Sequence, residues 1–257
     1  MNETEEYREI AYDLHLHSCL SPCADNDMTP ANIAGMAFLN GLKVAALTDH
    51  NTCANCPAFF EACRALGVIP VAGMELETAE EIHLVCLFDG LADALTFSDA
   101  VETHRMPIPN RPEIFGDQLI MNAQDEVIGR EKHLLIAATD LALSDAAALA
   151  RAHGGIVYPA HIDRQANGII SILGDIPPEP GFTAAELHEA QQRAAYADRY
   201  PLLQQMSFVS SSDAHHLWDI SEGENTLPLS HAADPDGIAG EDAVRRRLFA
   251  HLKHENE

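Results

Sequence analysis

The chain has 257 residues and a formal charge of −25, from 40 acidic and 15 basic residues. An acidic surface of this kind excludes tight, non-specific binding to duplex nucleic acid, because it repels phosphates. No apolar run reaches the roughly 18 residues of a membrane span, and residues 1–9 are acidic. We therefore expect neither a transmembrane segment nor a secretory signal, and a cytoplasmic location. No Gly/Ser-rich or Pro-rich linker divides the chain, which favours one domain.

The first predicted strand covers residues 10–17 and ends in Asp13-Leu14-His15-Leu16-His17-Ser18. Alternate residues of a strand point to the same side. His15 and His17 therefore project together, as two imidazole ligands of one metal ion would. An H-x-H pair alone is a weak signal, and it gains weight here from the ligand-type residues that follow later strands.

Strands and helices then alternate along the chain. Thr29-Pro30 predicts a helix N-terminus, and the continuous apolar run at 44–47 is typical of a strand buried on both faces. The predicted elements are a helix from Thr29 to Asn40, a strand at 44–47 that leads to His50, a helix at 57–66, a strand at 68–74 that leads to Glu75, and a strand at 82–88 that carries His83. This alternation favours βαβ units and a parallel sheet or barrel.

The middle third, about residues 89–140, interrupts this order. We interpret it as an insertion or small subdomain over the mouth of the barrel, with a hairpin formed by residues 118–122 and 126–129. A surface elaboration without a part in the chemistry is an equal alternative. The elements predicted after it are a helix at 144–153 capped by Ser144, strands at 156–158, 184–187 and 207–211, and a closing helix at 242–252 with Arg245, Arg246 and Arg247 on its surface.

Metal-ligand residue types gather at the carboxyl ends of the predicted strands, where α/β barrels place their active sites. They are His15, His17, His50, Glu75, His83, His161, Asp213 and His215. Imidazole and carboxylate together suit divalent Zn, Mn or Fe. The set exceeds the needs of one tetrahedral ion, so we expect two or three ions, with Glu75 able to bridge two. Clustered ions turn a bound water into hydroxide and stabilise both oxygens of a displacement at phosphorus.

The motifs DLHLHS, TDHN, GMELE followed by EIHL, PAHID and SSDAH, in that order, resemble the five-part signature of the PHP (polymerase and histidinol phosphatase) superfamily. The resemblance covers residues 10–90 and 153–217. It implies a single PHP-type domain over residues 1–257, folded as a distorted (β/α)7 TIM-like barrel of the α/β class, with a di- or trinuclear metal site. Members are mostly metal-dependent phosphoesterases, acting on histidinol phosphate, nucleotides, nucleoside bisphosphates or the ends of DNA and RNA.

The resemblance also implies an assignment of ligands to ions. One ion takes His15, His17, Glu75 and Asp213; a second shares Glu75 and adds His83 and His161; a third takes His50 and His215. The first loop departs from the family pattern, since many members have Ser-Asp-Gly after the H-x-H. This chain has Pro22 where the acid is expected, so Cys23 or Asp25 could supply the missing ligand. A thiolate there would bias the site towards Zn or Fe.

Other polar residues near these motifs allow two interpretations each. Asp49 could orient the neighbouring ligand histidine or cap the next turn. Arg164 resembles the arginine that follows the family's A-H-P motif and could hold a phosphate, or lie on the surface. Cys53 and Cys56 form a C-x-x-C that, with Cys19 and Cys23, could bind a further metal or act as a redox pair. Small reduced core residues are the favoured interpretation for the cysteines.

The remaining histidines show no ligand spacing, and we expect them at the surface or facing away from the metals. They are His104, His133, His153, His188, His216, His231, His251 and His254.

The predicted function is a metal-dependent phosphoesterase that hydrolyses a small phosphorylated metabolite or nucleotide through a metal-bound hydroxide, with Arg164 positioning the phosphate. An exonuclease acting on short oligonucleotides is the first alternative, and it requires basic residues near the site. A non-catalytic metal-binding or regulatory module is the second. The expected partner is the small phosphorylated substrate, with no stable duplex nucleic-acid binding and no membrane; the oligomeric state is not predicted.

Overall fold

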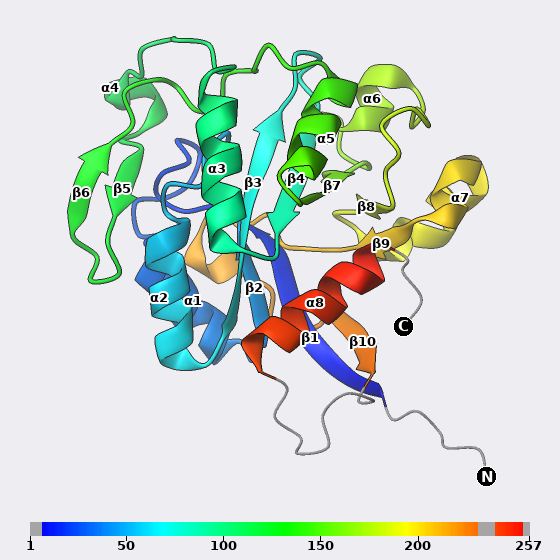
Figure 1. The fold of residues 1–257 in the computed structure, drawn as a ribbon, viewed down its shortest axis with the longest axis horizontal. Coiled ribbons are helices and arrows are strands. Elements are labelled where there is room, and N and C mark those ends of the chain that lie inside the picture. The colour runs from blue at the N-terminus through cyan, green and yellow to red at the C-terminus, as the bar shows by residue number, and fades with distance from the viewer. Residues whose placement is uncertain (1–6, 231–239, 254–257) are drawn as a thin grey trace.

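The computed structural model describes residues 7–230 and 240–253, which form an α/β fold around a curled, mixed sheet (Figure 1). The six-stranded sheet has the order β10-β1-β2-β3-β4-β7. Its strands are β1 (Tyr7–Leu16), β2 (Val44–Leu47), β3 (Ile69–Glu77), β4 (His83–Phe88), β7 (Ile156–Pro159) and β10 (Thr226–Ser230). Two further pairs are the parallel β8 (Ala184–Glu186) and β9 (Ser207–Val209), and the antiparallel β5 (Leu119–Met121) and β6 (Val127–Arg130).

Helices cover the sheet from both sides. In Figure 1, α1, α2 and α3 lie towards one edge and α5 lies beside β4, while α8 crosses the molecule next to β1 and β10. Their bounds are α1 (Pro30–Leu39), α2 (Cys56–Leu66), α3 (Leu91–Glu102), α4 (Pro112–Phe115), α5 (Leu143–Ala152), α6 (Ile169–Leu173), α7 (Arg193–Arg199) and α8 (Glu241–Leu252). Short 3-10 helices are η1 (Ala190–Gln192), η2 (Pro201–Gln205) and η3 (Leu217–Asp219). No helix in the described ranges is long and apolar enough to span a bilayer.

Local sequence signals set most helix ends. The Thr29 side chain accepts a hydrogen bond from the backbone N–H of Asn32 at the start of α1 (3.2 Å), and Gly67 ends α2 at φ +75°. Both match the prediction. The α5 terminus does not, because the helix begins at Leu143 and Ser144 lies inside it. The Glu80 carboxylate accepts from the Leu143 N–H (3.0 Å), so a distant loop supplies the oxygen that Ser144 was predicted to supply.

The sheet is mixed, whereas the alternation of strands and helices predicted parallel neighbours. β1, β2 and β3 are parallel, but β4 runs antiparallel to β3, and β7 antiparallel to β4. The reason is the short connection 78–82, since a parallel crossover needs about a dozen residues or more. Glu77 pairs with His83 across this turn. His83 therefore begins its strand, yet it lies at the same edge of the sheet as the end of β3.

Two apolar clusters lie on opposite faces of the sheet, and β3 contributes to both. Met74 and Leu76 pack with α1, α2 and α3, whereas Ile69 and Val71 enter the cluster that α8 closes at one end. Alternate residues share a face, so Glu75 points to the same side as Ile69 and Val71 but nearer the other end of the strand. The curled sheet is thus filled by apolar side chains at one end and by polar ones at the other.

Gly73 lets β3 approach its neighbours closely beneath Glu75. A Cβ at this position would lie 2.8 Å from side-chain atoms of Leu87 and Thr48, and 2.9 Å from the carbonyl oxygen of Cys86. No other amino acid fits here without moving a strand.

The middle of the chain joins the rest of the fold at two places. Helix α3 packs on β3 and β4 and belongs to the helical layer. The β5–β6 hairpin, at the left of Figure 1, adjoins the start of α2, where the Asn55 side chain donates to the carbonyl of Leu119 (3.1 Å) and accepts from the N–H of Met121 (2.9 Å). Leu119 and Met121 form a small apolar cluster with Cys19.

Arg245 corrects one prediction for the closing helix. Arg246 is exposed, but Arg245 is only 5% exposed. Its guanidinium contacts the carboxylates of Glu241 and Asp242 and lies 3.4 Å from that of Asp89. The face of α8 towards β3 thus contains a buried arginine surrounded by acids, which the run of three arginines did not reveal.

Candidate metal centre

The structure brings the eight predicted ligands together at one end of the curled sheet. His15 and His17 lie at the end of β1, and His50 follows β2. Glu75 lies near the end of β3, and His83 is the first residue of the neighbouring strand β4. His161 follows β7, and Asp213 and His215 follow β9. All are buried except His83 and His215, which are partly buried.

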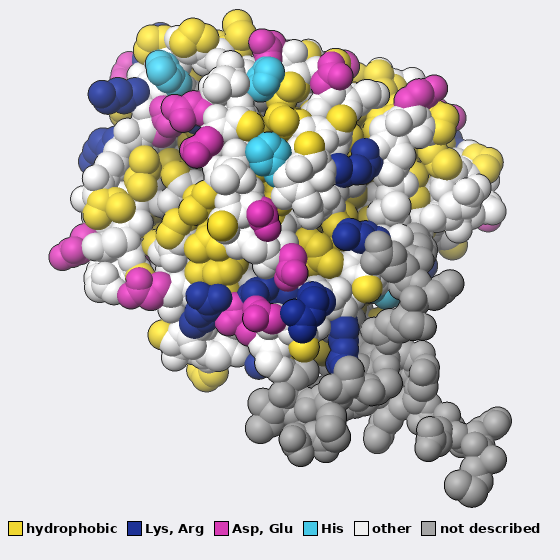
Figure 2. Space-filling model, viewed as in Figure 1, with side chains coloured by type: hydrophobic (Ala, Val, Ile, Leu, Met, Phe, Trp, Pro, Cys, Tyr) yellow, Lys and Arg dark blue, Asp and Glu magenta, His cyan; other side chains and the backbone are white. Residues whose placement is uncertain are grey.

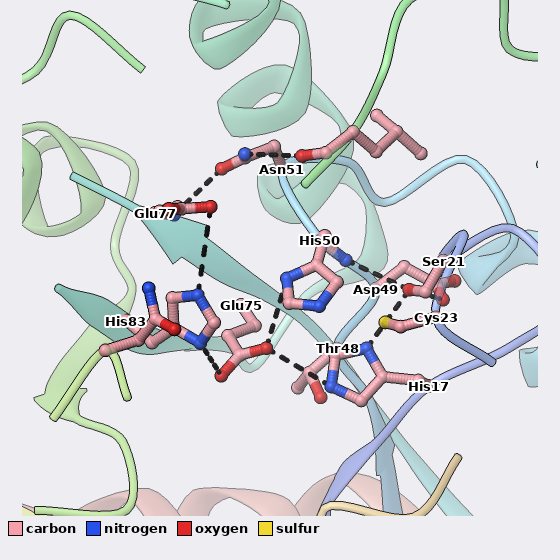
Figure 3. A network of polar contacts seen from close by, with 12 residues as sticks. His17, Ser21, Cys23, Thr48, Asp49, His50, Asn51, Glu75, Glu77 and His83 are labelled. Carbon is pink, nitrogen blue, oxygen red and sulfur yellow. Dashed lines mark hydrogen bonds and ion pairs between the residues drawn. The ribbon is translucent and has the colours of Figure 1, made fainter. Parts of the chain in front are cut away.

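Glu75 is the centre of this cluster (Figure 3). Its Oε1 lies 2.8 Å from His83 Nδ1, 3.1 Å from His161 Nε2 and 3.3 Å from His15 Nε2. Its Oε2 lies 3.2 Å from both His17 Nε2 and His50 Nδ1. Each carboxylate oxygen thus faces a different set of imidazole nitrogens, the arrangement of a carboxylate that bridges two ions.

Three groups of side chains each offer ligand atoms within 4.8 Å of one another. They are His15, His17, Glu75 and Asp213; His50, Glu75 and His83; and His17, His50 and His215. The first equals the first ion's predicted set. The other two differ from the predicted assignment, since His50 joins the Glu75–His83 group and His17 joins the His50–His215 pair. His161 still contacts the same oxygen of Glu75 as His83 does.

The outer ring nitrogens of three ligand histidines are held by hydrogen bonds. His15 Nδ1 lies 3.0 Å from the Glu186 carboxylate, and His17 Nδ1 lies 3.0 Å from Ser21 Oγ. His215 Nδ1 donates to the backbone carbonyl of Asp213 (2.8 Å). These contacts leave Nε2 directed at the cluster, which is how metal-ligating histidines are usually held.

Glu186 was not among the predicted site residues. It is fully buried in β8, where its carboxylate contacts only the outer nitrogen of His15 among the ligands. A glutamate inside a short apolar strand is the signal that could have identified it, because a buried carboxylate needs a partner.

Asp49 acts on His17 through serines. Its carboxylate accepts hydrogen bonds from Ser18 N–H, Ser18 Oγ and Ser21 Oγ, each at 2.7 Å. Ser21 in turn contacts His17 Nδ1 and accepts from the N–H of His50. The interpretation of Asp49 as a positioning residue therefore fits the contacts better than that of a turn cap, although it orients His17 rather than its neighbour His50.

The electrostatics of the cluster favour added positive charge. Burial opposes ionisation of Glu75, but His83, His15 and His50 outweigh it and hold the pKa of Glu75 well below its usual range. Burial likewise disfavours charged imidazoles, yet the carboxylates Asp213 and Glu75 raise the pKa of His17 to about 8. Glu75 raises the pKa of His83 to about 10 against the same effect. The carboxylates thus favour protonation of His17 and His83, whereas burial lowers the pKa of His50 and lowers that of His215 to about 4.

Divalent cations fit this donor set. Three buried ligand-type atoms that face the cluster, His50 Nδ1, His83 Nδ1 and Asp213 Oδ1, lie 2.8–3.2 Å from other polar atoms of the cluster but make no well-aligned hydrogen bond. This is costly for polar atoms unless something else contacts them. Nitrogen and carboxylate oxygen are the ligands of Zn and of related transition ions. The cluster is thus of the metal-binding kind.

Arg164 lies at the rim of the cluster. Its guanidinium contacts the Asp213 carboxylate, and its Nη2 donates to His188 Nδ1 (3.1 Å). The side chain is 37% exposed. These contacts turn the guanidinium towards the metal centre, while part of the side chain stays exposed at the surface. His188, predicted as a surface histidine without a role, is exposed but connects to the site through this arginine.

The loop after β1 separates the two candidates for the missing acid. Cys23 Sγ lies 3.1 Å from His215 Nε2. The Asp25 carboxylate accepts from the N–H of Asp27 (2.8 Å) and lies 3.9 Å from His216 Nδ1. Cys23 therefore faces the cluster, and Asp25 faces the neighbouring turn.

The C-x-x-C thiols pack in the core beside β3. Cys53 Sγ donates to the carbonyl of Gly73 (3.2 Å) and Cys56 Sγ to that of Leu47 (3.8 Å). Burial raises the pKa of Cys53 well above its usual value, so it stays a neutral thiol. The groups of metal-ligand residues found within the described ranges contain no cysteine, which agrees with the favoured interpretation of these two residues. His231 and His254 lie outside the described residues.

This chain is similar to several known proteins in sequence or in fold. A 5'-3' exoribonuclease of Haemophilus influenzae is 35% identical over 79 residues, which are 30% of this chain and 28% of that protein. Among solved structures, the lesion-specific endonuclease Q of Pyrococcus furiosus matches with a TM-score of 0.66 at 17% identity, over 97% of this chain and 57% of that one. A protein described as a metal-dependent phosphoesterase of Bifidobacterium adolescentis matches with a TM-score of 0.56 at 16% identity, over 95% and 97% of the two chains.

The chain thus spans about a quarter of the exoribonuclease's length and little more than half of the endonuclease's. At these identities the two structures show a shared fold only. The PHP domain family model matches residues 13–150, more than half of the 257 residues, and within that range lie DLHLHS, TDHN and GMELE with EIHL. The chain belongs to the PHP domain family.

Proposed function

We propose that this protein is a metal-dependent phosphoesterase acting on a small phosphorylated metabolite or nucleotide. The observation that carries the proposal is Glu75, whose two oxygens face five imidazoles inside a buried edge that also presents Asp213 and Arg164. Two or three divalent ions of Mn, Zn or Fe bound by His15, His17, His50, Glu75, His83, His161, Asp213 and His215 would activate water and offset the negative charge of a phosphoryl group.

The chain's own residues would hold and orient this apparatus. Glu186 and Ser21 direct the ligand nitrogens of His15 and His17 inward, and Asp49 directs Ser21. Arg164 would place guanidinium N–H donors against phosphoryl oxygens, since its planar fork suits two of them. The surrounding burial excludes bulk water and strengthens each of these interactions.

For the third ion we propose Cys23 as the ligand in place of the family's acid. Its Sγ lies 3.1 Å from His215 Nε2, the ring nitrogen left free by the hydrogen bond of Nδ1. In protein loaded with Co²⁺, a sulfur ligand gives a strong charge-transfer absorption band. We expect this band in the native chain and in Cys63→Ser, and its loss in Cys23→Ser. A band that survives in Cys23→Ser would exclude Cys23 as the sulfur ligand.

An exonuclease acting on short oligonucleotides is the second candidate, because the Haemophilus influenzae relative is an exoribonuclease. The names of that relative and of endonuclease Q weigh against the expectation that this chain has no stable duplex nucleic-acid binding. The charge of −25 still favours short substrates over long duplexes, because each added phosphate increases the repulsion.

We also propose that residues 89–140 form an insertion of a seven-stranded barrel closed by β8 and β9. The backbone bridge between Leu16 and Ala214, which joins β1 to the loop after β9, supports this closure. The location we propose is the cytoplasm, where thiols such as the buried Cys53 stay reduced.

The test is phosphate release from phosphomonoesters, nucleotides and short oligonucleotides after loading with Mn, Zn or Fe. We expect release by the native chain, no release by His17→Ala, and unchanged release by His133→Ala, whose exposed ring lies away from the cluster. The best substrate decides between the phosphoesterase and the exonuclease. No release from protein shown by metal analysis to contain its ions would overturn the proposal and favour a non-catalytic metal-binding module.

A further inference from the structure

A cavity lies beside the loop that carries Asp213 of the metal centre. It has a volume of about 430 Å³, within the range of about 300–1,000 Å³ typical of small-molecule sites. Its walls come from the loop after β8, the serines after β9, and the segment from η3 to β10; the lining residues used below are His188, Ser212, Trp218, Asp219, Glu222 and Glu224.

Two contacts connect this cavity to the proposed phosphate site. His188 lines the cavity and accepts a hydrogen bond from Arg164, whose other nitrogen contacts Asp213. Ser212, which also lines it, directly precedes Asp213, and its backbone N–H donates to the Asp13 carboxylate (3.1 Å). A molecule with its phosphate at Arg164 could therefore extend its remaining part into the cavity.

Trp218 forms an aromatic wall of the cavity. It is 76% exposed, the highest value among the large hydrophobic side chains of the described residues. Its ring stacks on that of His216 with a centroid distance of 4.7 Å and an interplanar angle of 3°. One face of the indole is thus backed by a second ring, which leaves the other face available for a third planar ring.

The charge of the cavity excludes a second phosphate. Asp219, Glu222 and Glu224 lie in its lining, and none of them has a lysine or arginine partner among the ion pairs found in the described ranges. Carboxylates only accept hydrogen bonds when ionised, so they select groups that donate, such as ribose hydroxyls and the exocyclic amines of bases.

We propose that this cavity binds the nucleoside part of a nucleotide substrate, with the base stacked on Trp218 and the phosphate at Arg164. The assignment rests on the proposed phosphoesterase function and narrows it, because the indole face stacks on a planar base, whereas an acyclic polyol phosphate has no ring to stack on it. Trp218 is then a specificity-determining residue that touches the substrate away from the reacting phosphorus.

The first test needs no turnover. Trp218 is the single tryptophan of the chain, so the intrinsic tryptophan fluorescence of the native protein comes from this wall alone. We expect adenosine to quench it saturably, and glycerol phosphate to leave it unchanged. Free N-acetyltryptophanamide, titrated in parallel, corrects for absorption by the base. The absence of saturable quenching by adenosine and by the other nucleosides would overturn the proposal.

The second test is kinetic. Base stacking on an aromatic side chain contributes about 1–3 kcal/mol, so Trp218→Ala should raise the KM for a nucleoside monophosphate about five- to 150-fold relative to that for glycerol phosphate. Ile128→Ala removes another exposed apolar side chain (65% exposed), on the β5–β6 hairpin, and should leave the ratio of the two KM values unchanged. An equal effect of Trp218→Ala on both substrates would overturn the proposal.

The two tests separate this proposal from the function on which it rests. Phosphate release without nucleoside quenching leaves the phosphoesterase and removes the nucleoside cavity. Saturable quenching without release from any substrate leaves a nucleoside-binding cavity and removes the phosphoesterase.

Discussion

Among the described residues, Arg245 on α8 and the carboxylates of the metal centre are buried charges, and the chain neutralises the first more completely than the second. On α8, the Arg245 guanidinium is surrounded by Glu241, Asp242 and Asp89, and Arg64 adds a second cation 2.8 Å from Glu241. Basic and acidic side chains are accordingly interleaved in the lower part of the face shown in Figure 2, where α8 lies. At the metal centre, Glu75, Asp213 and Glu186 are buried among histidines, with Arg164 as the permanent cation in contact.

The two clusters differ in whether they need a cation that the chain itself does not supply. A buried charge requires a compensating charge, and for Arg245 the neighbouring carboxylates of the chain supply it. At the metal centre the imidazoles can supply it only by taking up protons, as the raised pKa of His17 and His83 indicates. Metal ions and protons therefore compete for the histidines of the metal centre, whereas the carboxylates near Arg245 are already paired with a cation of the chain.

The largest expected effect comes from removing the charge at the middle of the metal centre. In Glu75→Gln, two of the ligand groups lose the carboxylate they share. We expect bound metal to fall below detection in at least one site and phosphate release to drop more than about a hundredfold, since losing an outer partner alone costs about 10–100-fold. Metal analysis and phosphate release measure this. Glu113→Gln, on the distant α4, is the control; metal content equal to that of the control would contradict the bridging role.

Glu186→Gln should have the next largest effect. The amide keeps the shape but withdraws the charge that makes the His15 ring a better ligand, so metal affinity should fall about 10–100-fold. Competition with a chromophoric chelator measures the affinity. Glu189→Gln changes an exposed glutamate three residues along the chain and should leave the affinity within error. Unchanged affinity in Glu186→Gln would show that the contact with His15 has no influence on the metal.

Arg245→Met tests the other cluster and should act on stability alone. Breaking a buried ion pair costs about 3–5 kcal/mol when the remaining charge stays buried. Here the Asp242 side chain is 72% exposed and can hydrate, so we expect the free energy of unfolding to fall by only about 1–2 kcal/mol. Chemical denaturation measures it, with the exposed Arg246→Met expected within about 0.5 kcal/mol of the native chain. A change of metal content in Arg245→Met would show that the clusters are coupled.

The smallest effects are in the pH dependence, where the two clusters should act in opposite directions. The pKa of His17 rises from 6.5 to about 8 in the fold. In metal-stripped protein, protonated His17 therefore contributes fully to the free energy of unfolding below pH 6.5, and this contribution is lost as the pH rises through about 8. Hydrogen bonding to Arg64 lowers the pKa of Glu241 below 4.5. That contribution is present above pH 4.5 and is lost as the pH falls through the lowered pKa.

Denaturation curves across this pH range, with and without chelator, measure both contributions. Bound metal should reverse the trend at the histidines, because fewer protons compete for the ring nitrogens as the pH rises. Metal-stripped protein that becomes more stable between neutral and alkaline pH would contradict the assigned origin of the His17 shift.

Much of this protein could be predicted from short-range patterns. Thr29 and Gly67 mark helix ends through contacts with residues a few positions away, and the 44–47 strand follows from a continuous apolar run. The motif order identified the family, which the match over residues 13–150 confirms. These features depend on neighbours along the chain, so the sequence displays them directly.

What only the folded chain decided are contacts between distant residues. His15 meets Glu186 across 171 positions, and Cys23 meets His215 across 192. The burial of Arg245, the antiparallel course of β4 and the direction in which Cys23 and Asp25 point are of the same kind. Each depends on which surfaces pack together when the sheet curls, and packing of remote segments leaves no periodic trace in the sequence. The residue types at the metal centre were therefore predictable, whereas the partners that hold them in place became known only from the tertiary structure.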